Sequence, residues 1–151
     1  MNAMPTTPAA VDVAGLASTL RLSVTRLSRK LRREGAGAEI SPTLVSALAT
    51  VDRHGSMTVG ELATHEQLQK PTVTRIVADL LENDLIARTP DPLDGRISWL
   101  QTTAEGRRLL HRIRRRRDDY LAARLKRLSP HELEALERAA GLLERLTEVE
   151  A

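Results

Sequence analysis

The chain has 151 residues, with 23 Lys and Arg against 20 Asp and Glu, and its formal net charge is +3. The absence of cysteine excludes disulfides, thiolate metal sites and cysteine nucleophiles, and one Trp and one Tyr are too few rings for stacking on RNA or single strands. No apolar run reaches the roughly 18 residues of a membrane span and we expect no signal peptide, so the sequence predicts a cytoplasmic globular protein.

The charge is unevenly distributed along the chain. Residues 104–127 contain ten basic and three acidic residues, a net +7 that includes the run Arg114–Arg117. Residues 58–103 contain four basic and seven acidic residues, a net −3. A basic block of this kind is either a solvated helix face or a surface that faces an anion.

The amino-terminal part combines an arm and a long helix. Residues 1–10 hold two Pro and mostly small side chains, and are expected to form a disordered arm. From residue 11 to about 34, apolar residues recur every three or four positions, which predicts a helix with a narrow stripe typical of a helix–helix seam: Val13, Leu16, Leu20, Val24, Leu27 and Leu31. The Glu-Gly-Ala-Gly segment at 34–37 is expected to end this helix.

Three further helix starts follow. Ser41 and Pro42 combine an N-cap hydroxyl with a first-turn proline and predict a helix to about residue 54. Thr58 and Glu61 have capping-box spacing and predict a short helix to about residue 66. A fourth helix begins at the Lys-Pro pair 70–71. Its buried face is expected to consist of Val73, Ile76, Val77, Leu80 and Leu81, and its outward face of Gln69, Lys70, Thr72, Thr74, Arg75 and Asp79.

The hydrophobic period then changes to that of strands. Residues 86–89 are typical of a short strand, residues 90–95 form a turn cluster that ends in Asp-Gly, and residues 96–102 are typical of the returning strand. The three preceding helices and this hairpin are therefore expected to form one compact unit.

Two helices complete the chain. Thr102 or Thr103 caps a fifth helix, since Thr102 with Glu105 has capping-box spacing, and Arg117 interrupts its apolar stripe of Leu109, Leu110, Ile113, Tyr120, Leu121 and Leu125. The segment 129–132 begins a last helix with a second seam-like stripe: Leu133, Leu136, Ala140 and Leu143. The first and last helices are expected to pair, within or between subunits.

Three helices followed by a two-stranded ribbon is the order of a winged helix-turn-helix. In that arrangement the N-terminal part of the second helix of the pair enters the major groove of DNA. Here this part presents Lys70, Thr72, Thr74 and Arg75. Arg75 can bind guanine through two hydrogen bonds, and the threonines can contact thymine methyls or phosphates. The alternative is an ordinary solvated helix face, and the hairpin that follows favours the DNA-binding interpretation.

The stretch 71–88, followed by Asp94-Gly-Arg96 and by the Thr-Ala-Glu-Gly-Arg-Arg-Leu-Leu segment at 103–110, resembles the MarR family of bacterial transcriptional regulators. The resemblance covers residues from about 11 to 150. It implies a mainly α fold with a small β-hairpin wing, in which residues 41–103 form a winged helix-turn-helix DNA-binding domain. Residues 11–40 and 104–151 would then form the helical dimerisation domain of a homodimer.

The resemblance also implies a binding site. Thr72, Thr74 and Arg75 would lie at major-groove positions of a pseudo-palindromic double-stranded operator. On the wing, which also carries Arg88, Arg96 would enter the minor groove, and Asp94 would orient it. A narrow minor groove concentrates negative potential, so an arginine on a hairpin tip suits it.

Two positions need comment against the family pattern. The usual Gly before Leu-Ile is Asp84, so either the helix ends without a glycine cap or Asn83 takes the left-handed position. The usual Leu before the fifth helix is Thr102.

Family members are often released from DNA by small aromatic acids, and Arg117 is the residue that could pair with such a ligand. Its alternatives are a salt bridge to Asp or Glu, or extension into solvent.

The sequence offers little to catalysis or metal binding. The four histidines have no metal-ligand spacing, and there is no phosphate-binding glycine loop, nucleophile elbow or catalytic triad order. We expect no enzymatic activity, no metal and no cofactor. The sequence therefore predicts a homodimeric, sequence-specific DNA-binding transcriptional regulator, a repressor released by a small molecule. The alternative is a helical dimer that acts as a protein-interaction module with weak or lost DNA binding, which the net −3 of residues 58–103 favours.

Overall fold

The computed structural model describes residues 11–36 and 39–148, so the expected arm at 1–10 lies outside the described residues. Six helices and a three-stranded sheet make up the described chain, in the order α1 (Val13–Ala36), α2 (Pro42–His54), β1 (Met57–Thr58), α3 (Val59–Glu66), α4 (Lys70–Glu82), β2 (Ile86–Pro90), β3 (Ser98–Thr102), α5 (Ala104–Leu125) and α6 (Pro130–Glu148). The molecule is mostly helical with a small antiparallel sheet, as the sequence predicts.

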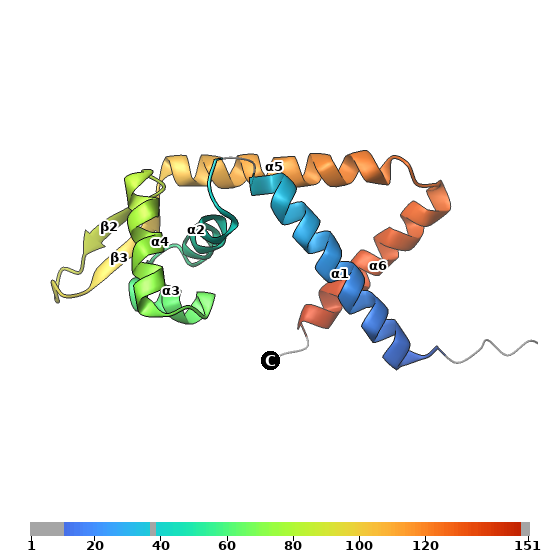
Figure 1. Cartoon of the computed structure of the whole chain (residues 1–151), viewed down its shortest axis with the longest axis horizontal. Coiled ribbons are helices and arrows are strands. Elements are labelled where there is room, and N and C mark those ends of the chain that lie inside the picture. Colours follow the sequence, from blue (N-terminus) through green and yellow to red (C-terminus); the bar gives the residue numbers. More distant parts are fainter. Residues whose placement is uncertain (1–10, 37–38, 149–151) are drawn as a thin grey trace, which may run out of the picture.

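The elements gather at the two ends of α5 (Figure 1). Helices α2, α3 and α4 and the sheet surround its amino-terminal half, while α1 and α6 lie beneath its carboxy-terminal half and cross in this view. α5 thus connects a compact winged unit to a pair of long helices. No helix within the described ranges is long and apolar enough to cross a membrane.

Local side-chain caps set most helix starts. The Ser41 hydroxyl accepts a hydrogen bond from the Leu44 amide at 3.3 Å, and the Thr58–Glu61 capping box forms with both reciprocal bonds. Ser129 and Glu132 make a second reciprocal pair at the start of α6. Each cap satisfies amides that have no partner within the first turn.

The start of α5 differs from one of the two sequence-based alternatives. Thr103 is the N-cap, and its hydroxyl accepts from the Gly106 amide at 3.0 Å. Thr102 is instead the last residue of β3, where it is buried and pairs with Ile86. The expected capping box of Thr102 with Glu105 is therefore wrong, because strand pairing fixes Thr102 one residue before the cap.

The sheet has the order β1–β3–β2, with antiparallel pairing throughout. β1 is only two residues long, and nothing in the sequence pattern signalled it. The returning strand begins at Ser98 and not at residue 96, because Arg96 and Ile97 belong to the turn, where the Ile97 amide donates to the Asp94 carbonyl at 2.9 Å.

One hydrophobic core holds the winged unit together. The buried residues of α4 are Val73, Ile76, Val77 and Leu80, as its helical periodicity predicts, and Leu81 is half-buried. They pack with buried side chains of the neighbouring elements: Leu48, Val51, Leu62, Leu100, Leu109, Leu110 and Ile113. Burial of one face of α4 leaves its other face to solvent.

The turn after α4 settles which residue adopts the left-handed conformation. Asp84 has φ 54°, whereas Asn83 has φ −90°, so the expectation for Asn83 is wrong and the helix ends without a glycine. The Leu85 amide donates to the Leu80 carbonyl and the Asp84 amide to the Leu81 carbonyl, which is the Schellman pattern. An aspartate adopts this conformation more readily than most residues because its side chain is short and polar, but its Cβ still makes the conformation less favourable than it is for glycine.

The apolar stripes of α1 and α6 remain uncovered in the single chain. On α1 they include Leu16, Leu20, Val24 and Leu27, which are 36–47% exposed, and on α6 they include Leu133, Leu136, Leu142, Leu143 and Leu146, which are 37–69% exposed. The two helices line a common apolar hollow of about 520 Å³. Exposed leucines in such number on neighbouring helices are typical of a surface that another chain covers.

Candidate nucleic-acid interface

The first turns of α4 present the side chains that the sequence singled out. Lys70, Thr74 and Arg75 are exposed, and Thr72 is half-buried. The Thr74 hydroxyl donates to the Lys70 carbonyl at 2.9 Å, which leaves its methyl group and its oxygen lone pairs toward solvent. No acidic residue lies in the first turn of α4. This end of α4 is therefore open and basic, as a helix that enters a groove requires.

Arg96 is an exposed arginine held in one orientation. Its Nε and Nη2 donate to Oδ1 and Oδ2 of Asp94 at 3.1 and 3.2 Å, and its own backbone amide donates to Oδ1 at 3.0 Å. The Arg96 side chain is nevertheless 91% exposed. The hydrogen bonds from Arg96 lower the pKa of the Asp94 carboxyl. A two-point contact limits the rotamers of the arginine, so less conformational entropy is lost when it binds an anion.

Asp91 organises the wing turn, and sequence reasoning missed it. Its Oδ1 accepts from the amides of Leu93 and Asp94 at 2.8 and 3.0 Å, and its Oδ2 accepts from the indole Nε1 of Trp99 at 2.8 Å. The Trp99 bond and then the two amides lower the pKa of the Asp91 carboxyl. An aspartate often accepts a hydrogen bond from the amide two residues later, so the sequence could have predicted the bond from the Leu93 amide. No sequence pattern could have predicted the contact with Trp99.

Arg88 lies on β2 at the side of the wing. It is exposed, and it pairs in register with Leu100. Arg88 and Arg96 line a hollow of about 500 Å³ together with the start of α3 at 58–60. The structure thus brings the two wing arginines next to the amino-terminal end of a helix, where partial positive charge also accumulates.

The seven acidic residues at 58–103 cap a helix, bond to other side chains, hold the wing turn or lie toward the carboxy-terminal end of α4. Glu61 caps α3, Glu66 accepts from the Thr50 hydroxyl at 2.6 Å, and Asp91 and Asp94 hold the wing turn. The others, Asp79, Glu82 and Asp84, lie in the carboxy-terminal half of α4 or just after it. Four of these seven acids therefore bond to groups of the same chain, and Asp94 does so directly beside Arg96.

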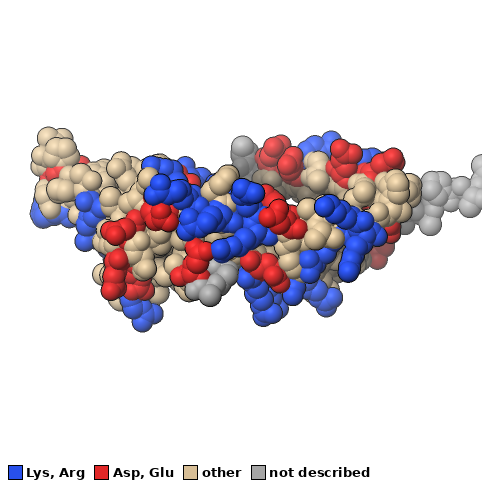
Figure 2. Space-filling view, turned by 90° about the horizontal axis from the view of Figure 1, so that it is seen from above, with Lys and Arg blue, Asp and Glu red and all other residues tan. Residues whose placement is uncertain are grey.

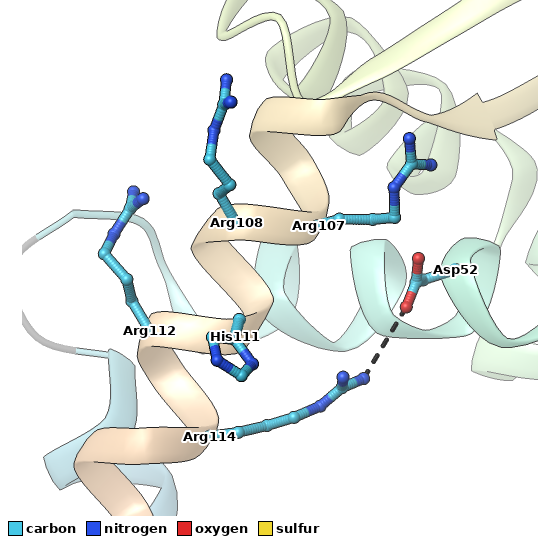
Figure 3. Close-up of a pocket in the computed structure, with 6 residues that line it drawn as sticks. All are labelled: Asp52, Arg107, Arg108, His111, Arg112 and Arg114. Atoms are coloured by element: carbon cyan, nitrogen blue, oxygen red, sulfur yellow. Dashed lines mark ion pairs between the residues drawn. The ribbon is translucent and has the colours of Figure 1, made fainter.

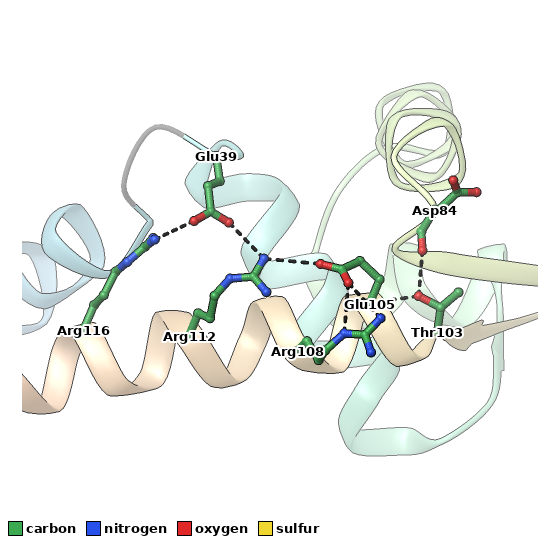
Figure 4. Close-up of polar contacts among 8 residues, drawn as sticks. Glu39, Asp84, Thr103, Glu105, Arg108, Arg112 and Arg116 are labelled. Atoms are coloured by element: carbon green, nitrogen blue, oxygen red, sulfur yellow. Dashed lines mark hydrogen bonds and ion pairs between the residues drawn. The ribbon is translucent and has the colours of Figure 1, made fainter.

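Four of the ten basic residues at 104–127 form ion pairs, and Figure 4 shows those of Arg108, Arg112 and Arg116. Glu39, just before α2, binds both Arg112 and Arg116, and these bonds, Arg116 first, lower the pKa of its carboxyl. Glu105 binds Arg108 and Arg112 at 3.0 and 3.3 Å. In Figure 2 basic atoms gather in the middle of the face, with acidic atoms beside them, so the block is a solvated surface that neighbouring acids compensate only in part.

A shallow hollow of about 530 Å³ runs along the first half of α5, lined by Asp52, Arg107, Arg108, His111, Arg112 and Arg114. Figure 3 shows Arg107 and Arg114 extending from one side of α5 toward α2, and Arg108 and Arg112 extending from the other side. Arg114 approaches Asp52 at 3.7 Å, and Arg107 donates to the Thr102 carbonyl at 2.7 Å. These arginines bind residues of the same chain and connect α5 to its neighbours.

Arg117 packs against α1. Its side chain is half-buried and lies directly over Gly35, where an added Cβ would come within 2.6 Å of Arg117 Cγ. Its Nε is buried with no hydrogen-bond partner, and within the described ranges no carboxylate forms an ion pair with it. Burial, followed by the charges of Arg32 and Arg114, lowers the pKa of the guanidinium. The suggested salt bridge is therefore not formed in residues 11–36 and 39–148.

Clusters of metal ligands are absent from the described residues. No group of three or more His, Asp or Glu side chains there could hold a metal ion. The rings of His54 and His65 pack against each other at 4.3 Å between centroids, which joins α2 to α3.

Three comparisons place this architecture among known proteins. Residues 40–98 match the model of the MarR family. An HTH-type transcriptional regulator of Mycobacterium tuberculosis is 39% identical over 130 residues, which span 86% of this chain and 91% of that protein. The HTH-type transcriptional repressor MdtR of Bacillus subtilis is 34% identical over 96 residues, which span 60% of this chain and 61% of MdtR.

Among solved structures, a candidate transcriptional regulator from Pseudomonas aeruginosa superposes with a TM-score of 0.80 at 32% identity. The match covers 91% of this chain and 96% of the other. Members of the family are DNA-binding regulators and not enzymes, which agrees with the site geometry above. The similarity extends over the winged unit and the long helices alike, and the chain belongs to the MarR family of helix-turn-helix transcriptional regulators.

Proposed function

We propose that the protein is a homodimeric, sequence-specific repressor that binds a pseudo-palindromic double-stranded operator and is released by a small acidic ligand. The observation that carries the proposal is Arg96, which is 91% exposed yet held by two hydrogen bonds to Asp94 at the tip of the wing. A preorganised cation that the fold leaves in solvent is suited to a narrow minor groove.

DNA binding and dimer formation are assigned to the elements at opposite ends of α5. Residues 41–103 form the DNA-binding unit, in which Lys70, Thr72, Thr74 and Arg75 meet the major groove while Arg88 and Arg96 reach the adjacent backbone and minor groove. Bidentate contact of Arg75 with guanine would supply base specificity, and the wing would supply affinity that depends less on sequence.

The dimer forms through residues 11–40 and 104–151. The support is the uncovered leucine surface of α1 and α6 and the apolar hollow between them. A second copy of the chain would cover this surface and place two winged units side by side, as a two-fold symmetric operator requires. Burial of such leucines would contribute about 25 cal/mol per Å² of apolar area removed from water.

Two further observations support repression and release by a ligand. The relative MdtR is a repressor by name, and this supports the direction of regulation. Arg117 lines an apolar hollow of about 340 Å³ with Val24, Leu27, Leu31 and Leu143. A guanidinium with an unpartnered Nε beside an apolar wall could bind the carboxylate of a small aromatic acid, with the ring against the leucines.

The test is a binding titration with DNA from upstream of the protein's own gene, at several salt concentrations. Arg96→Ala should weaken binding to all sequences and reduce the salt slope by about 1 per subunit, and Arg75→Ala should cost about 1–3 kcal/mol per subunit and relax the sequence preference. Arg115→Ala removes the same charge from an exposed position on α5 and serves as the control. Tight binding that tolerates both substitutions would refute the assignment of the site.

A second candidate function is a helical dimer that binds another protein through the winged unit. The net −3 of residues 58–103 favours it, because phosphate neutralisation supplies most non-specific affinity for DNA. Absence of saturable, salt-sensitive binding in the same titration would favour this function over DNA binding.

A further inference from the structure

We propose that Asp91 and Trp99 form a positioning pair that holds the wing tip, and through it Arg96, in the orientation that meets DNA. This inference rests on the proposed DNA-binding function and adds two residues to it. Neither residue needs to touch DNA, because both act through Asp94 and Arg96.

The first step is the contact between the turn and the sheet. The Trp99 indole Nε1 donates to Asp91 Oδ2 at 2.8 Å, and both residues are half-buried. Trp99 lies on β3, the central strand, where it pairs with Thr58 of β1 and with Thr89 of β2. The backbone of Trp99 is therefore paired on both sides, so the side chain that bonds to the turn starts from a fixed position in the sheet.

In the second step, the hydrogen bonds continue from Asp91 through Asp94 to Arg96. Asp91 Oδ1 accepts from the Asp94 amide at 3.0 Å, which fixes the backbone of Asp94. The Asp94 carboxylate in turn accepts from the Arg96 amide and from two atoms of its guanidinium. Trp99, Asp91, Asp94 and Arg96 thus form one continuous chain of hydrogen bonds from the sheet to the tip.

The third step concerns the exposure of the tip. Arg96 is 91% exposed and Leu93 is 98% exposed, so apolar packing does little to fix either residue. A hairpin tip without a packed side chain depends on its own hydrogen bonds for order. Both carboxylate oxygens of Asp91 are used, one for the turn and one for the indole. An asparagine keeps the shape but has one acceptor oxygen, so its N–H₂ faces either the indole or the two turn amides, and one of the two sets of bonds is lost.

The experiment has one readout without DNA and one with it. Trp99 is the only tryptophan, so the protein has a single indole N–H resonance and a single source of tryptophan fluorescence. Asp91→Asn should shift the indole resonance upfield as its charge-assisted bond is lost, whereas Asp118→Asn, an exposed acid on α5, should leave it in place. An unchanged indole resonance in Asp91→Asn would overturn the proposal.

The DNA readout compares affinities in two backgrounds. Asp91→Asn should weaken operator binding by about tenfold in the unaltered protein and by less than twofold in the Arg96→Ala background, since contacts in one network are not additive. Trp99→Phe, which keeps the Asp91 turn and removes only the indole donor, should show the same dependence on Arg96. An equal loss of DNA affinity in both backgrounds would refute the positioning role but would leave the proposed DNA-binding function intact. If the unaltered protein binds no DNA, the proposed function fails and this role fails with it.

Discussion

Gly106 offers a sharp test of how α5 is joined to the wing. The glycine is buried in the first turn of α5, and a Cβ built on it would overlap the carbonyl oxygen of Leu85 and lie 2.8 Å from Thr102 Cγ2. The Leu85 carbonyl oxygen already accepts from the Thr103 amide at 3.0 Å, and the Thr103 hydroxyl donates to the neighbouring Asp84 carbonyl at 2.6 Å. The backbone at Asp84 and Leu85 is therefore held by hydrogen bonds, and it could move away from a new Cβ only by weakening them.

Gly106→Ala should destabilise the protein by about 1–2 kcal/mol. Overpacking costs about 1–3 kcal/mol, and a clash with held backbone belongs to the upper part of that range, roughly 2–3 kcal/mol, of which the better helix preference of alanine returns up to ~1 kcal/mol. For a chain of this size that loss lowers Tm by about 2–8 °C. Gly60→Ala is the matched control, because it also lies in the first turn of a helix and its Cβ would meet only Thr58 Oγ1 at 3.9 Å.

The assay is thermal unfolding followed by circular dichroism, with both variants at the same protein concentration because association raises Tm. Gly60→Ala should match or slightly exceed the unaltered protein, and Gly106→Ala should fall below it. If Gly106→Ala is as stable as Gly60→Ala, the close approach of α5 to Leu85 is not the reason for the glycine.

Three further outcomes are expected. Asp84→Gly should raise the free energy of unfolding by about 0.5–1 kcal/mol in urea titrations, because glycine adopts φ 54° without the strain of a Cβ. Leu142→Glu should shift the protein toward monomer in sedimentation at equal concentration, since Leu142 lines the uncovered apolar surface, and an unchanged mass would contradict the dimer interface proposed here. Stability should fall as the pH drops below about 4. The pKa values of carboxyls such as Asp91, Asp94 and Glu105 are lowered in the folded protein. Their hydrogen bonds and ion pairs therefore stabilise the fold fully above that pH, and this stabilisation is lost as the carboxylates become protonated. Urea titrations between pH 3 and 7 measure this loss, which should be smaller in Asp91→Asn.

The sequence alone predicted the six helices and the β-hairpin, and it suggested the type of site. Helix caps such as Thr58–Glu61 and Ser129–Glu132 act within one turn, and the apolar period of α4 separates its buried face from the face with Arg75. These signals are local, because the atoms that interact are three or four residues apart. The Asp94-Gly-Arg96 segment is local as well, and its ion pair forms as expected.

Only the tertiary structure decided how distant residues meet. Glu39 lies 77 positions from Arg116 in the chain, so no local pattern could show that this acid binds the basic block of α5. The choice of Thr103 over Thr102 as the cap depended on strand pairing, and the burial of Arg117 over Gly35 depended on the approach of α1 to α5.

The net charge of +3 illustrates the same division. The sequence located a +7 segment and a −3 segment, and the second appeared unsuited to bind DNA. The fold places the acids of the winged unit in caps, in the wing turn and toward the far end of α4, and it leaves Arg75 and Arg96 exposed. Composition counts charges, whereas packing and hydrogen bonding decide which of them reach the surface that a partner meets.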